Sequence, residues 1–268
     1  MHPGTKKPAD EFPQRVFITG ASSGIGRALA RHYAKQGAQL GLAARRPHEL
    51  EALMAELEVP CAIYPLDVRD ADALAQAAQD FMQRFGVPDI VIANAGVSRG
   101  TLTEHKQDTT AFKAIMDINV LGMVHTFQPF IQAMKTAGEG RLAGIASVAG
   151  IRGLPGAEAY SASKAAAISY LESLRIEMAG TGIAVTTIAP GYIRTAMTDV
   201  NTYSMPFLMG VDVAAEKFAS AIARKRRFVI IPWQMGMVAK LMRLIPPALW
   251  DRLMKKAPHK PRLHWDWL

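Results

Sequence analysis

Short apolar runs alternate along the chain with longer stretches in which apolar residues recur every three or four positions. The short runs predict buried strands, and the longer stretches predict amphipathic helices. Strands are expected at 15–20, 38–45, 61–68, 89–96, 140–147, 183–190 and 227–232. Helices are expected at 23–37, 47–57, 70–86, 108–136, 158–180 and 212–225.

This alternation predicts an α/β fold, a Rossmann-type doubly wound parallel sheet of about seven strands with helices on both faces. In such sheets ligands bind beyond the carboxyl ends of the strands. We expect a tail at 1–12, a single catalytic and cofactor-binding domain at 13–233, and an extension at 234–268.

Composition narrows the class of protein. The chain has 268 residues, half of them hydrophobic, which suits one large domain. Its single cysteine, Cys61, excludes an internal disulfide and favours a reducing, cytoplasmic compartment. The first 14 residues lack the apolar core of a secretory signal, and no uncharged apolar run is long enough to predict a membrane span. No metal site is expected.

The net charge of +8 is unevenly distributed. Residues 224–268 contain 11 basic and two acidic residues, whereas residues 1–223 contain 20 basic and 21 acidic residues. The body is therefore nearly neutral, which argues against a nucleic-acid partner and makes the extension a separate problem.

A glycine-rich turn joins the first strand to the first helix. Gly20, Gly24 and Gly26 have the spacing G-x-x-x-G-x-G, and Ser22, Ser23 and Ile25 lie between them. Glycines allow a tight turn and close approach of the backbone to a phosphate, and the following helix presents free N–H groups to the anion. The turn predicts a dinucleotide site.

The end of the second strand predicts which dinucleotide binds. An acidic residue there would hold a ribose 2′-hydroxyl, but this chain has Ala44 followed by Arg45 and Arg46. A guanidinium can bind a 2′-phosphate through paired hydrogen bonds, so we expect NADP(H) rather than NAD(H). The alternative is that one or both arginines simply face solvent.

Tyr160 and Lys164 are four residues apart in a predicted helix and should lie on one face. Together with "TGASSGIG" (19–26), "NAG" (94–96), Asn119 and Ser147, the "YSASK" segment (160–164) resembles the short-chain dehydrogenase/reductase family. The resemblance covers about residues 13–233, with the motifs in the family's order.

The resemblance implies roles for individual residues. It implies a catalytic set of Asn119, Ser147, Tyr160 and Lys164, in which Lys164 also holds the cofactor's ribose and Asn119 fixes a water. The further cofactor-binding positions that it implies are Asp67, Val68, Asn94, Ala95, Gly96, Pro190, Gly191, Ile193 and Thr195.

Tyrosine chemistry explains why a lysine would be placed beside Tyr160. A carbonyl that receives a hydride needs a proton, and the pKa of tyrosine, about 10, is high for this exchange near neutrality. A cation about 4 Å away contributes about 4 kcal/mol, or on the order of three pKa units. We therefore expect Tyr160 to be the proton donor, and Ser147 to hydrogen-bond the substrate oxygen.

The substrate is expected to be a small apolar ketone, aldehyde or alcohol. Residues 196–211 resemble the family's variable lid and are rich in methionine. No arginine clamp for a carboxylate stands out, although Arg99 and Arg152 stay open for that role. The substrate positions expected are Ser147, Ala149, Leu154, Tyr160, Tyr192 and Met197. The rival activities are a 3-oxoacyl thioester reductase and a non-catalytic NADP(H)-binding regulator or scaffold.

The extension at 234–268 predicts two short amphipathic helices broken at Pro246 and Pro247, with basic residues among the apolar ones. Three uses stay open: docking on the chain's own surface, coverage of the substrate entrance or a partner subunit, and peripheral contact with an anionic membrane. We expect a homo-oligomer, a dimer or tetramer.

Overall fold

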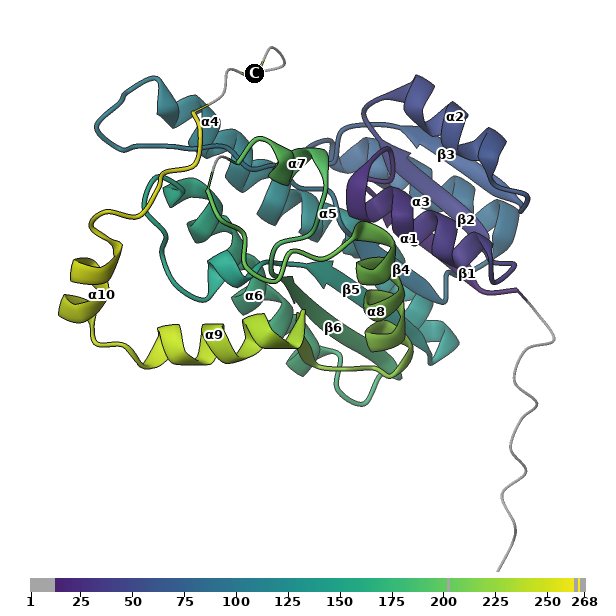
Figure 1. Cartoon of the computed structure of the whole chain (residues 1–268). Coiled ribbons are helices and arrows are strands. Elements are labelled where there is room, and N and C mark those ends of the chain that lie inside the picture. The colour runs from purple at the N-terminus through teal and green to yellow at the C-terminus, as the bar shows by residue number, and fades with distance from the viewer. Residues whose placement is uncertain (1–12, 202, 263–264, 266–268) are drawn as a thin grey trace, which may run out of the picture.

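The computed structural model describes residues 13–201, 203–262 and 265. The tail expected at 1–12 lies outside the described residues. Seven parallel strands form one sheet, as predicted, and their order is β3-β2-β1-β4-β5-β6-β7 (Figure 1). The strands are β1 (Arg15–Thr19), β2 (Gln39–Ala44), β3 (Cys61–Pro65), β4 (Ile90–Ala93), β5 (Gly140–Ile145), β6 (Ile183–Pro190) and β7 (Phe228–Ile231).

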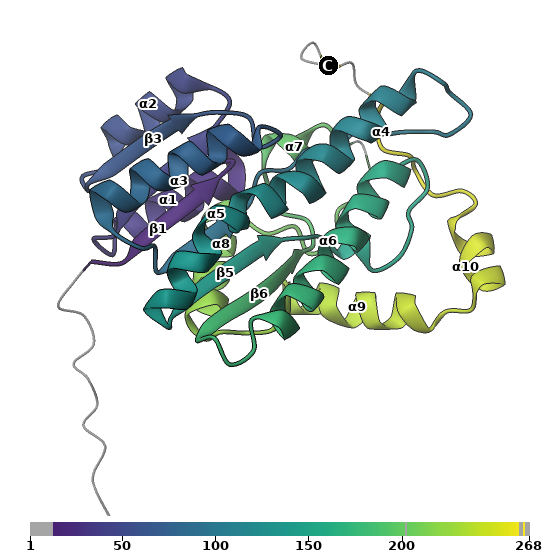
Figure 2. The same ribbon diagram turned by 180° about the vertical axis from the view of Figure 1, so that it is seen from behind.

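Helices cover both faces of the sheet. One face carries α1 (Gly24–Ala34), α2 (Pro47–Glu56) and α8 (Val211–Ala223). The other face carries α3 (Ala71–Phe85), α5 (Gly122–Ala137) and α6 (Glu158–Glu177), which lie in front of the sheet in Figure 2. The remaining helices are α4 (Asp108–Met116), α7 (Ala196–Asp199), α9 (Trp233–Leu244) and α10 (Pro247–Met254).

Each face of the sheet has its own apolar core. Phe17 of β1 packs against Phe81 and Phe130 on one side, with ring centroids 5.6 and 5.0 Å away. On the other side Leu40 and Leu42 of β2 are fully buried. Strands covered on both faces read as continuous apolar runs, which is why the sequence shows short unbroken runs.

Several predicted elements have different ends in the structure; the fourth and fifth strands, for example, end at Ala93 and Ile145 rather than at 96 and 147. The third strand stops at Pro65 because the chain turns directly afterwards, where the Asp67 carbonyl accepts a hydrogen bond from the Asp70 N–H. The long helix expected at 108–136 exists, but a π-helical turn, Asp117–Leu121, separates α4 from α5. Such wide turns are rare and are frequent at functional sites.

The extension forms the two predicted helices, α9 and α10, at one edge of the body (Figure 1). Its following segment, residues 257–262, returns across the loops that follow β4 and β5. The Pro261 carbonyl accepts a hydrogen bond from the Gly100 N–H, and the Arg262 guanidinium pairs with the buried Asp108 carboxylate at 2.8 Å. We call residues 257–262 the strap.

Candidate active site

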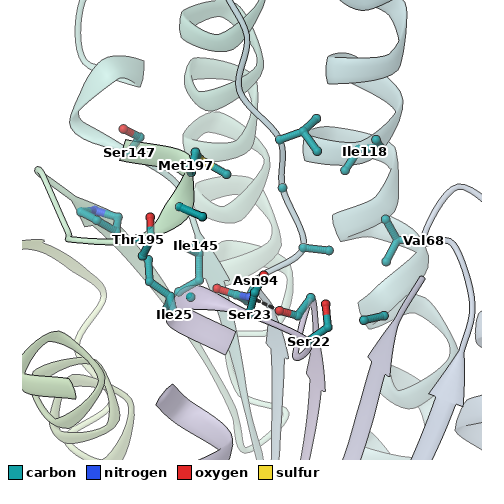
Figure 3. Close-up of a pocket in the computed structure, with 18 of the residues that line it drawn as sticks. Ser22, Ser23, Ile25, Val68, Asn94, Ile118, Ile145, Ser147, Thr195 and Met197 are labelled. Carbon is teal, nitrogen blue, oxygen red and sulfur yellow. Dashed lines mark hydrogen bonds between the residues drawn. The ribbon is translucent and has the colours of Figure 1, made fainter. Parts of the chain in front are cut away.

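A cavity of about 310 Å³ lies beyond the carboxyl ends of the strands. The loops that follow β1 to β6 all contribute to its wall, as expected for a parallel sheet. Ser147 and Met197 lie at one end of the cavity, and Ser22 and Val68 lie toward the other (Figure 3).

The glycine turn lines the cavity toward the end where Ser22 lies (Figure 3). Gly20 and Gly24 have φ angles of +68° and +53°, which side chains rarely adopt. A Cβ on Gly26 would lie 2.2 Å from the Gly20 carbonyl oxygen, so this position requires glycine. The Ser23 side chain does not cap α1, which leaves the N–H groups of the helix's first turn facing an anion site.

Asn94 fixes the glycine turn to the adjacent strand. Its side-chain amide donates hydrogen bonds to the carbonyls of Thr19 and Gly20, at 3.1 and 3.2 Å. The turn is thus held in shape by the loop after β4 before any ligand binds.

Both arginines predicted from the sequence line the cavity beside this turn. The Arg46 guanidinium donates a hydrogen bond to the Ser22 hydroxyl at 3.1 Å. Burial lowers the pKa of Arg45, and the nearby Asp67 carboxylate raises it. Two guanidinium groups therefore border the end of the cavity farther from Tyr160.

Asp67 and Val68 border the same end from the segment that follows β3. The Asp67 carboxylate accepts hydrogen bonds from the Arg69 side chain at 2.7 and 3.1 Å. Burial raises the pKa of Asp67, but the bonds and the charge of Arg69 outweigh it, so this pKa lies below its ordinary value. The carboxylate is therefore ionised at neutral pH.

Ser147, Tyr160 and Lys164 meet at the opposite end. Ser147 follows β5, and its hydroxyl accepts a hydrogen bond from the Ala149 N–H at 3.1 Å. The Lys164 ammonium is buried, donates a hydrogen bond to the Ile145 carbonyl at 2.8 Å and lies 5.8 Å from the centroid of the Tyr160 ring. The i, i+4 spacing therefore does place both side chains on one face.

The pKa of Tyr160 differs from the sequence-based expectation. Burial raises this pKa above its ordinary value of 10, and a hydrogen bond with Ser147 offsets only part of the rise. Burial also lowers the pKa of Lys164 to about 8. Desolvation thus outweighs the hydrogen bond with Ser147, and Tyr160 is protonated at neutral pH.

Asn119 lies in the π-helical turn, behind the cavity wall. Its side-chain oxygen accepts a hydrogen bond from the Val97 N–H at 2.8 Å, and its amide donates one to the Ser163 hydroxyl at 3.0 Å. A Cβ on Gly96 would lie 3.2 Å from this oxygen and 3.5 Å from the Lys164 nitrogen. Gly96 therefore allows Asn119 and Lys164 to approach each other.

Most of the predicted positions line the cavity, and a few do not. Among the described residues, the predicted positions outside its wall are Gly26, Asn119, Ala149, Leu154 and Tyr192. Gly26 and Asn119 support the wall from behind. Leu154 borders a second hollow of about 670 Å³ beside α10, and Ala149 is buried.

Sequence reasoning missed three features near the site: Tyr203, Ser163 and the strap. Tyr203 lies in the lid, 6.4 Å from the Tyr192 ring, and burial, with Tyr192 and Tyr160 nearby, raises its pKa to about 12. The Lys260 ammonium in the strap donates to Asn201 of the lid at 3.4 Å. These partners are far apart in sequence, so no local pattern could have linked them.

The two arginines left open as substrate clamps have other partners. Arg152 donates hydrogen bonds to the carbonyls of Met242 and Ile245, at 2.7 and 2.6 Å. Arg99 pairs with Asp108 at 3.4 Å. Both guanidinium groups are therefore bound by groups of the chain itself.

The cavity suits a nicotinamide dinucleotide. A glycine turn at a helix N-terminus and two arginines can hold the phosphates, and Ser147, Tyr160 and Lys164 border the far end, where hydride chemistry needs a proton. Within the described residues, no group of three or more histidine, cysteine or acidic side chains could hold a metal ion.

Comparisons with known proteins agree with this geometry. Residues 14–204 match the short chain dehydrogenase family model. An uncharacterized oxidoreductase of Myxococcus xanthus is 37% identical over 244 residues, covering 90% of this chain and 96% of the relative.

Two crystal structures are also similar. Levodione reductase superposes with a TM-score of 0.74 at 25% identity, over 82% of this chain and 96% of that one. An alcohol dehydrogenase of Thermococcus sibiricus, complexed with 5-hydroxy-NADP, superposes with a TM-score of 0.71 at 27% identity, over 81% of this chain and 95% of that one. The fold, the family model and the relatives agree: the chain belongs to the short-chain dehydrogenase/reductase family of oxidoreductases.

Proposed function

We propose that this oxidoreductase uses NADP(H) to interconvert an apolar ketone or aldehyde with its alcohol, and that Tyr160 donates and accepts the proton. The observation that carries the proposal is one continuous cavity. It has Arg45 and Arg46 at one end and Ser147, Tyr160 and Lys164 at the other.

The preference for NADP(H) rests on charge at the end of β2. A 2′-phosphate carries about two negative charges near neutral pH, and charge-assisted bonds to a guanidinium are about twice as strong as neutral ones. Ala44 offers no carboxylate that would repel this phosphate. The Thermococcus sibiricus enzyme, which is complexed with 5-hydroxy-NADP, supports the choice by analogy.

Proton transfer depends on the protonation state of Tyr160. When bound, the nicotinamide supplies the hydride to the carbonyl carbon. The Ser147 hydroxyl can donate a hydrogen bond to the carbonyl oxygen, which polarises the carbonyl and orients it toward Tyr160. Because burial raises its pKa, Tyr160 stays protonated at neutral pH and can release its proton from Oη to the developing alkoxide.

Lys164 and Asn119 support this step. Protonated Lys164 is the nearest buried cation to the Tyr160 ring, and its charge favours the tyrosinate left after transfer. Asn119 holds the Val97 backbone and Ser163 around the lysine. We propose that a water held near Asn119 returns the proton from solvent.

An apolar substrate is favoured because, among the described residues, Lys164 is the one cation that lines the Tyr160 end of the cavity, and it lies beside the Tyr160 ring. Arg99 and Arg152 are engaged elsewhere, and Met197 lines the cavity wall. We also propose a homo-oligomer, supported by exposed apolar side chains at Phe112, Leu121 and Ile176, which light scattering can test.

The test is NADPH oxidation with a graded series of ketones and aldehydes, from short polar to long-chain and polycyclic, together with 3-oxoacyl thioesters. The proposal expects kcat/KM to rise with apolar size. A preference for the thioesters would favour the rival reductase. Tight NADPH binding without turnover of any carbonyl would favour a regulator or scaffold.

A further inference from the structure

The outer face of α9 exposes a row of large apolar side chains. Trp233, Met237, Leu241 and Leu244 follow one another at intervals of four, four and three residues, so they lie on one side of the helix. Each is between 63% and 80% exposed. Single exposed apolar residues are ordinary, but a continuous row of four is not.

α10 extends the exposed apolar surface. Leu249 and Leu253 lie four residues apart and are both exposed. We call these six residues of α9 and α10 the outer stripe. They account for six of the fifteen large apolar side chains that are exposed in the described part of the chain. The exposure is therefore concentrated on the extension.

The opposite sides of both helices are fixed to the body. Met235 of α9 is buried, and a Cβ on Gly191 would lie 2.6 Å from its Cγ. Arg152 caps the end of α9 through two backbone carbonyls, and its guanidinium lies 4.8 Å from the centroid of the Trp250 ring in α10. The helices cannot turn the outer stripe inward without breaking these contacts.

Positive charge accompanies the outer stripe. Lys240, Arg243 and Arg252 are exposed on the same two helices, Lys255 and Lys256 are exposed directly after α10, and Asp251 is the one acidic residue there. Within the described part of the chain none of the five cations forms an ion pair, in contrast to the paired arginines of α1. The five charges are free to meet an external anion.

The five cations would meet like charges in a second copy of this face but opposite charges on an anionic lipid surface. In a two-fold interface the same face meets itself, so five cations on each copy would be brought together, which costs several kcal/mol. An anionic lipid surface accepts the apolar side chains at the acyl boundary and the cations among its headgroups. No helix of the described residues is long and apolar enough to cross a bilayer, so α9 and α10 would lie within the interface.

We propose that the outer stripe and its cations dock the chain on an anionic lipid surface. Arg152 lies in the loop that follows Ser147, so docking there brings the substrate side of the molecule close to the lipid. The partner is lipid carrying negative headgroups, and the attraction weakens as salt screens the charge.

Flotation with vesicles tests the proposal. Vesicles of phosphatidylglycerol and phosphatidylcholine in equal parts are compared with vesicles of phosphatidylcholine alone, at low and high salt. The full chain should float with the anionic vesicles at low salt only. The double variant L241Q/L244Q should lower the partition coefficient at least about tenfold, because it removes two apolar side chains from the interface.

Further variants test whether the cations contribute to binding and whether the substitutions leave the fold intact. The variant K240Q/R243Q should lower the partition coefficient about fivefold for each charge removed. The matched control is V213Q, because Val213 of α8 is 49% exposed, close to Leu249 at 48%, but lies outside the extension; its partition should be unchanged. All variants should keep the wild-type Tm and NADPH affinity.

Three results would overturn the proposal. The first is no flotation of the wild-type chain with anionic vesicles at low salt. The second is equal binding to phosphatidylcholine vesicles. The third is that L241Q/L244Q leaves flotation unchanged but dissociates an oligomer in light scattering, which would assign the outer stripe to a second copy.

Discussion

Exchanging Ala44 for Asp and Arg45 for Leu should reverse the cofactor preference from NADPH to NADH. Both residues line the cavity at the end of β2, next to the glycine turn. The change removes one of the two guanidinium groups and introduces the carboxylate that binds a ribose 2′-hydroxyl.

The magnitude follows from the two charges involved. A hydrogen bond to a charged group contributes about 1.5–3 kcal/mol, and Arg45 is exposed to solvent, so about 2 kcal/mol is expected for its loss. A carboxylate about 8 Å from a doubly charged phosphate, at an effective dielectric of about 40, costs about 2 kcal/mol more. Together these changes amount to roughly a thousandfold in the ratio of the two cofactors.

The assay is kcat/KM for NADPH and for NADH with the same ketone. The control is Arg84→Leu, which removes an exposed arginine from α3, outside the cavity, and should leave the ratio unchanged. If the double variant still prefers NADPH as strongly as the wild type, the arginine does not bind the 2′-phosphate and the reasoning is wrong.

Three further predictions concern protonation, the strap and the core. Burial lowers the pKa of Lys164 to about 8, so the lysine loses its charge as pH rises through that value. For this reason kcat/KM for carbonyl reduction should fall above pH 8, and a flat pH profile up to about pH 10 would contradict this. Arg262→Ala breaks the pair with Asp108, so it should lower the free energy of unfolding by about 1–2 kcal/mol and make Lys260 accessible to trypsin. If trypsin cleaves the variant no faster than the wild type, other contacts hold the strap. Phe130→Ala should cost about 3–5 kcal/mol in urea denaturation, because Phe130 is fully buried against Phe17; a loss under about 1 kcal/mol would refute the packing argument.

The parallel sheet and most helices could be predicted from the sequence because each strand is a short apolar run bordered by a polar turn, whereas the order of the strands required the structure. The glycine turn and the Tyr160–Lys164 pair were equally visible, since their chemistry depends on local spacing. Local rules also placed the break between α9 and α10, where Pro246 and Pro247 interrupt the pattern.

Features that depend on distant contacts could not be predicted. The π-helical turn at Asn119 interrupts a stretch whose apolar pattern looks like an ordinary helix. The pair Arg262–Asp108 joins residues 154 positions apart. The pKa of Tyr160 also required the structure, because burial depends on the packing of several loops, whereas the sequence shows only the neighbouring lysine.

The most direct measurement of the central claim compares Tyr160→Phe with the wild type in NADPH binding and in single-turnover reduction of the best ketone of the series. The matched control is Tyr170→Phe, a change on the same helix but outside the cavity. If Tyr160 donates the proton, NADPH binding should persist while the rate of reduction falls about 10²- to 10⁴-fold, and the control should keep the wild-type rate. A variant that binds NADPH and retains most of the wild-type rate would contradict the role of Tyr160.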